Sequence, residues 1–123
     1  MAYNSMPHPR VTGLISMAGG RGQVMTKSGL GGICRPDLLA DAAGRLARTA
    51  TTPMLWVYAE NDKFFAPEIA AAIYGAYTQN GGKAEFEHLG PFGEDGHRLF
   101  STPGGSQIWG PLVARYLASR PAQ

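Results

Sequence analysis

The stretch MLWVYAENDKFF, residues 54 to 65, decides the fold of this chain. Its first six residues form a near-continuous apolar run rich in residues that favour β-structure. Strands that are covered on both faces of a parallel sheet have runs of this kind. The polar residues Glu60, Asn61, Asp62 and Lys63 then end the run. We therefore expect a buried strand with a polar loop at its carboxyl end.

Two further strands and three helices are expected around this stretch. Residues 11–17 form a second buried apolar run, whereas residues 84–89 alternate around Phe86, as a strand nearer an edge does. Apolar residues at helical spacing predict helices over residues 37–48, 68–79 and 107–119, and Pro36 and Pro67 stand at the starts of the first two. The glycine-rich residues between 18 and 35 are expected to form a long loop.

The alternation of strands and helices predicts an α/β fold with a parallel sheet. At 123 residues the chain holds one hydrophobic core, so residues 1–123 are expected to form a single domain. About three parallel strands flanked by helices make only part of a three-layer sandwich, and such a sheet leaves open edges. Either the chain associates with a second copy or another subunit, or it is a piece of a larger domain.

Composition excludes several classes of function. Charged residues make up only 16% of the chain, and the basic residues lie scattered without the dense stripe of a nucleic-acid surface. No apolar run reaches membrane-spanning length and no secretory leader is visible, so a cytoplasmic protein without membrane contact is expected. The single cysteine, Cys34, excludes an internal disulfide, and with His8, His88 and His97 it lacks any metal-ligand spacing. We expect no metal and no cofactor.

Candidate chemistry lies just after the predicted strands, where open α/β sheets bind ligands. Asp62 follows the predicted strand of residues 54–59, and His97 follows that of residues 84–89, in the loop GPFGEDGH of residues 90–97. An acid and then a histidine in this chain order match the last two members of the Ser, Asp, His order of α/β hydrolases. A buried carboxylate can hold one imidazole nitrogen and leave the other free to act as a base.

Three runs carry a resemblance to a known family: TPMLWVYAENDKFFAPEIA at residues 52–70, GPFGEDGHRLF at residues 90–100 and GLISMAGGRG at residues 13–22. Together they resemble the dienelactone hydrolase-like branch of the α/β-hydrolase superfamily over residues 10–117. The resemblance implies hydrolysis of an ester, lactone or other acyl bond, with Asp62 as the triad acid and His97 as the general base.

The chain departs from this family in one essential feature, because it has no G-x-S-x-G nucleophile elbow. None of Ser16, Ser28 and Ser106 stands in such a motif. Residues 1–9 resemble the tail of the helix that follows an elbow, so the chain is similar to the C-terminal half of a hydrolase. We expect it to have little or no activity by the serine route when alone.

Weaker candidates accompany the Asp62 and His97 pair. Arg21 is placed to meet an anionic substrate, or is simply solvated, and Phe64 and Phe92 either line an acyl pocket or pack the core. Cys34 is expected to be a buried structural thiol or a passive loop residue. The glycines between 19 and 32 match no phosphate-binding motif. The alternative function is a non-catalytic module that self-associates or docks on another subunit.

Overall fold

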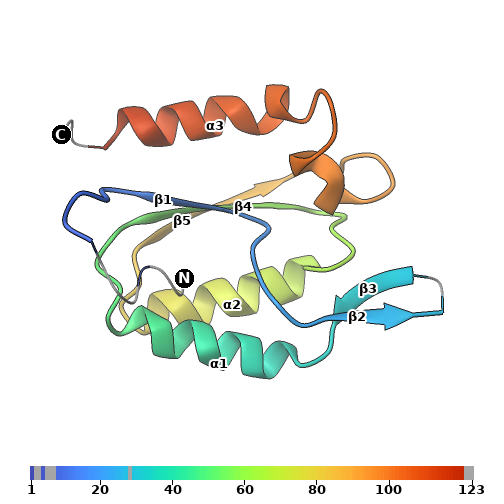
Figure 1. Cartoon of the computed structure of the whole chain (residues 1–123), viewed down its shortest axis with the longest axis horizontal. Coiled ribbons are helices and arrows are strands. Elements are labelled where there is room, and N and C mark those ends of the chain that lie inside the picture. Colours follow the sequence, from blue (N-terminus) through green and yellow to red (C-terminus); the bar gives the residue numbers. More distant parts are fainter. Residues whose placement is uncertain (2–3, 5–7, 28, 121–123) are drawn as a thin grey trace.

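The computed structural model describes residues 1, 4, 8–27 and 29–120, and over these residues it is a mixed α/β fold (Figure 1). A parallel sheet of three strands has the order β1 (Leu14–Met17), β4 (Met54–Ala59) and β5 (Ala84–Leu89). The expected tail of a helix over residues 1–9 falls mostly outside the described residues. No helix in the described part of the chain is long and apolar enough to cross a membrane.

The strands β4 and β5 have the predicted bounds, whereas β1 is shorter than residues 11–17. Leu14 pairs with Met54, the first residue of β4, and the Leu14 N–H donates to the Pro53 carbonyl. Residues 11–13 therefore extend past the end of β4, the strand with which β1 pairs among the described residues. Strand propensity without a partner gives no ladder, which is why the prediction for residues 11–13 was wrong.

Helices cover both faces of the sheet (Figure 1). The helices α1 (Pro36–Ala47) and α2 (Pro67–Gln79) lie side by side on one face, and α3 (Ser106–Ala118) lies on the other. All three lie within one or two residues of their predicted bounds. A short 3₁₀ helix, η2 (Gly96–Phe100), connects β5 to α3.

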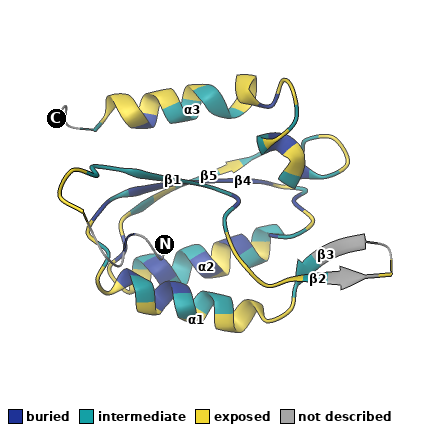
Figure 2. Cartoon of the chain, in the orientation of Figure 1, coloured by how far each residue is buried: buried dark blue, intermediate teal, exposed yellow. Residues whose placement is uncertain are grey.

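The core lies on the two faces of β4, whose six residues are all buried (Figure 2). Trp56 and Tyr58 point to the α1 and α2 side, where they pack with Ile73 and Tyr77. Leu55 and Val57 point to the α3 side and pack against Tyr116. The middle strand is thus held rigidly from both faces, which fixes the position of the loop at its carboxyl end.

The residues between β1 and α1 do not form the long loop that the glycines suggested. They include an antiparallel hairpin of β2 (Gln23–Thr26) and β3 (Gly29–Ile33). Three of the five residues of β3 are glycines, so its sequence lacks the alternation of apolar and polar residues that predicts a strand. Gly22 and Gly32, with φ of 92° and 67°, adopt backbone conformations that other residues rarely reach. The Gly32 N–H donates to the Lys63 carbonyl and so ties the hairpin to the loop after β4.

Candidate functional site

Asp62 lies in the turn that ends β4, and its side chain has no exposed surface. One carboxylate oxygen, Oδ1, accepts hydrogen bonds from the N–H groups of Phe64 at 2.8 Å and Phe65 at 2.9 Å. Aspartate commonly stabilises turns by bonding to backbone groups two or three residues ahead. These two bonds orient the carboxylate and leave Oδ2 available for another partner.

That partner is His97, the second residue of η2. The His97 Nδ1 lies 3.0 Å from Asp62 Oδ2. β4 and β5 are parallel neighbours, so the loops at their carboxyl ends meet at one edge of the sheet, and this adjacency joins two residues 35 positions apart. An ionised carboxylate can only accept hydrogen bonds, so the proton of the neutral ring is assigned to Nδ1 and Nε2 keeps its lone pair.

The imidazole is enclosed on one side and open on another. Its side chain is 31% exposed, and the Phe64 ring meets it edge to face with 4.7 Å between centroids. The Phe65 ring centroid lies 6.0 Å away. Phe64 is therefore in contact with the candidate base, and it also packs against the core, which was the other interpretation of this residue. The exposed fraction leaves room for a reacting group to approach the ring.

A set of contacts between loops, which the sequence analysis missed, holds the pair in place. Asp95 Oδ1 accepts from the Lys63 N–H at 3.2 Å and from the His97 N–H at 3.1 Å. The Asn61 side chain accepts from the Phe92 N–H and donates to the Gly93 carbonyl, both at 2.9 Å. The only sequence signal was the presence of Asn and Asp next to the two site residues, which is common in ordinary turns.

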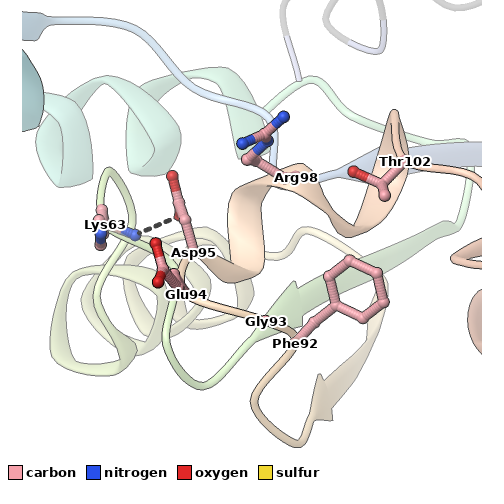
Figure 3. A pocket seen from close by; sticks show the side chains of 7 residues that line it. All are labelled: Lys63, Phe92, Gly93, Glu94, Asp95, Arg98 and Thr102. Atoms are coloured by element: carbon pink, nitrogen blue, oxygen red, sulfur yellow. Dashed lines mark hydrogen bonds between the residues drawn. The ribbon is translucent and has the colours of Figure 1, made fainter.

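Phe92 lies on a cleft of about 480 Å³ beside these loops (Figure 3). The residues that line the cleft are Lys63, Phe92, Gly93, Glu94, Asp95, Arg98 and Thr102. The side chains of Glu94 and Asp95 lie on one side of it and the Phe92 ring on the other. Neither Asp62 nor His97 lines this cleft, so it adjoins the pair without containing it.

Arg21, by contrast, lines a different cleft. It is exposed and borders a space of about 280 Å³ together with Ser16 of β1, Gly19 and Gly20 after β1, and an apolar face of α1. The Tyr58 hydroxyl donates a hydrogen bond to the Gly19 carbonyl at 2.8 Å, which connects β4 to the turn after β1. Burial, and secondarily the Asp62 carboxylate, raise the pKa of Tyr58. The structure thus brings Phe64 and Phe92 to the loops of Asp62 and His97, but it places Arg21 in another cleft.

No described serine or cysteine is hydrogen-bonded to His97. Ser16 lies within β1, Ser106 is the exposed first residue of α3, and Ser28 lies outside the described residues. Cys34 is exposed, so the expectation of a buried thiol was wrong and the passive loop residue remains. Among the described residues, no group of three or more His, Cys, Asp or Glu side chains could hold a metal ion.

The comparisons with known proteins give no relative for this chain. No protein-family model, no curated protein and no solved structure matches it.

Proposed function

We propose that this chain carries the acid and base of an acyl hydrolase that resembles the dienelactone hydrolase-like family, on part of an α/β-hydrolase sheet. The observation that supports it is the 3.0 Å contact between Asp62 Oδ2 and His97 Nδ1. It joins a fully buried carboxylate and a partly exposed imidazole at the carboxyl ends of adjacent parallel strands. Ligand sites of open α/β sheets lie at such strand ends.

The roles of the two residues follow from their protonation and burial. Asp62 holds His97 in the tautomer whose Nε2 can accept a proton, and it stabilises the imidazolium that then forms. His97 Nε2 removes the proton of a hydroxyl nucleophile as its oxygen bonds to the acyl carbon. The imidazolium then returns this proton to the departing alcohol as the bond to the leaving group breaks.

The nucleophile is the missing component in this proposal. No described serine is hydrogen-bonded to His97, so attack by water is the route open to the described chain. The family places the elbow on a strand that precedes β1, and successive strands of βαβ units usually pair. We therefore expect the strand that supplies the nucleophile to pair with the outer edge of β1, which pairs with no other strand among the described residues.

Turnover of a chromogenic short-chain ester by the wild-type chain and by His97→Ala tests the proposal. We expect slow turnover that depends on His97, because general base catalysis by one group contributes roughly 10²- to 10⁴-fold at most. A fluorophosphonate probe should label no residue, since no described serine is hydrogen-bonded to the base. Equal turnover by the two proteins would remove the enzymatic role from this chain.

A second candidate function, self-association, is favoured by the contrast between the two edges of the sheet. The β5 edge carries Glu85 and Glu87, which form ion pairs with Arg120 and Arg115, and charged residues protect sheet edges. β1, with the sequence LISM, has no charge. The Leu14 and Ala18 N–H groups bond to the β4 side, so strand alternation turns the N–H groups of Ile15 and Met17 outward.

We propose that a second copy of the chain pairs with this edge in antiparallel orientation. The two β1 strands would form a closed, two-fold symmetric contact in which no charge of one strand meets a like charge of the other. The apolar α1 residues that share a cleft with Ser16 of β1, namely Leu39, Ala42 and Leu46, would enlarge the contact. Light scattering after size exclusion should then show a dimer at micromolar concentration.

A matched pair of substitutions locates the contact. Met17→Lys should convert the dimer to a monomer, because a charge on the open edge opposes pairing. His88→Lys adds the same charge to the exposed position on β5 and should leave the dimer intact. A wild-type chain that is a folded monomer at this concentration would contradict self-association. If a strand of a different protein pairs with β1 instead, docking on another subunit replaces self-association as the second candidate function.

A further inference from the structure

The carboxylate of Asp95 joins the two loops that carry the candidate acid and base. Its Oδ1 accepts from the N–H of Lys63, the residue after Asp62, and from the N–H of His97 itself. Two backbone N–H groups that are more than 30 residues apart in the sequence thus donate to the same oxygen atom. Hydrogen bonds to a charged acceptor are stronger than neutral ones. We propose that Asp95 is a positioning residue, which sets the distance between Asp62 and His97 through the backbone.

The geometry shows why one oxygen can have this effect. Asp95 is the N-cap of η2, so its bond to His97 fixes the first turn of the helix that carries the imidazole. Its bond to Lys63 fixes the backbone directly after the acid. The ring and the carboxylate are 3.0 Å apart, and a change of about 1 Å in the separation of such groups lowers catalytic rates strongly. Asp95 touches neither side chain of the pair in any contact that the structure shows.

Asn61 supplies a second link between the same loops, but it holds a different point. Its side chain bonds to the backbone of Phe92 and Gly93, and its carbonyl accepts from the Gly96 N–H at 3.1 Å. These contacts keep the loop after β5 near β4 even when Asp95 is changed. Loss of the Asp95 carboxylate should therefore loosen the pair without detaching the loop, and the fold should survive.

The neighbouring residue, Glu94, offers a matched control. It is exposed, lies on the same cleft and has the same charge, but its side chain forms none of the hydrogen bonds and ion pairs found in the described part of the chain. Asp95→Asn offers the conservative variant, because the amide oxygen of asparagine can accept from the same two N–H groups. A role based only on negative charge in the cleft would be lost in Asp95→Asn and in Glu94→Ala alike.

The inference rests on the proposed function for its catalytic meaning, and the test keeps the two apart. In the wild-type chain, amide hydrogen exchange should be slow at Lys63 and His97. Asp95→Ala should speed it roughly 10- to 100-fold at these two positions, since a bond to a charged acceptor accounts for such a factor. The ¹⁵N resonances of the His97 ring should move toward a mixture of tautomers, Asp95→Asn should restore them, and Glu94→Ala should leave them unchanged.

Two outcomes would overturn the positioning role. The first is fast amide exchange at Lys63 and His97 in the wild-type chain, which needs no variant to fold. The second is a folded Asp95→Ala protein whose His97 resonances match the wild type. If these resonances respond as expected while His97→Ala turns over ester as fast as wild type, then the proposed function fails and the positioning role of Asp95 stands.

Discussion

At the scale of single residues, the site depends on close approach as much as on hydrogen bonding. Gly96 lies between the end of β4 and His97, and its N–H bonds to the Asn61 carbonyl. A Cβ at this position would come within 2.5 Å of Asn61 Oδ1 and 2.6 Å of the Ala59 Cβ. Both atoms are fixed by the buried strand and by the Asn61 contacts. The imidazole can therefore approach Asp62 only because residue 96 has no side chain.

Gly96→Ala should separate the two members of the pair. The added methyl group must displace η2 from β4, and overpacking of this kind costs about 1–3 kcal/mol of stability. We expect a lower free energy of unfolding in urea and loss of the Nδ1 hydrogen bond of His97 by NMR. Gly90→Ala is the control, since a Cβ there meets no atom within 4 Å. Equal behaviour of the two variants would refute this account of Gly96.

At the scale of elements, the helices and strands that could be predicted were those with a clear pattern of apolar residues. The three helices repeat their apolar residues at helical spacing, β5 alternates around Phe86, and β4 is a near-continuous apolar run ended by polar residues, so these five elements were predicted nearly to the residue. The meeting of Asp62 with His97 was predictable too, because strand ends of a parallel sheet share an edge. The hairpin and the Asp95 contacts were not, because glycine-rich strands and bonds from side chains to loop backbone leave no periodic pattern.

The buried Asn4 forms another set of contacts that the sequence did not predict. Its side chain donates to the Thr52 carbonyl at 2.5 Å and to the Tyr77 hydroxyl at 3.0 Å, and it accepts from the Thr52 N–H at 3.0 Å. It thereby links the start of the chain to the segment before β4 and to α2. Asn4 is fully buried, so its removal takes a hydrogen-bond partner away from polar groups in the interior.

Asn4→Ala should destabilise the protein by about 1–3 kcal/mol, because it leaves buried polar groups without partners. Urea unfolding followed by circular dichroism measures the loss. Asn80→Ala serves as control, since within the described part of the chain the exposed Asn80 side chain bonds only to the Ala76 carbonyl, one turn back in α2. A change below about 0.5 kcal/mol for Asn4→Ala, the range of ordinary surface substitutions, would show that this network does not stabilise the fold.

At the scale of the whole molecule, three buried tyrosines make the stability of the fold depend on pH. Tyr58 and Tyr77 pack on the α1 and α2 side of the sheet and Tyr116 on the α3 side. Burial is the main cause that raises the pKa of each phenol above its usual value of 10. The folded chain therefore keeps phenol protons at a pH at which the unfolded chain has released them.

This linkage predicts that stability falls as the pH rises above about 10. Below that pH both states hold the protons and the tyrosines give no pH dependence; above it the folded state binds more protons. Tyr58 alone should then lower the free energy of unfolding by up to ~1.4 kcal/mol per pH unit. Urea unfolding between pH 8 and 11 measures the slope, and Tyr58→Phe should make it shallower. A slope that is the same in both proteins would show that Tyr58 does not titrate with unfolding.

The most direct test of the whole account is the protonation state of the His97 ring, measured by long-range ¹H–¹⁵N NMR on the ¹⁵N-labelled chain. The contact with Asp62 predicts that the neutral form of the ring carries its proton on Nδ1 and leaves Nε2 without one, and Asp62→Ala should abolish that preference. A wild-type ring that carries its proton on Nε2, or whose resonances ignore the loss of the Asp62 carboxylate, would contradict the pairing of acid and base on which the proposed function depends.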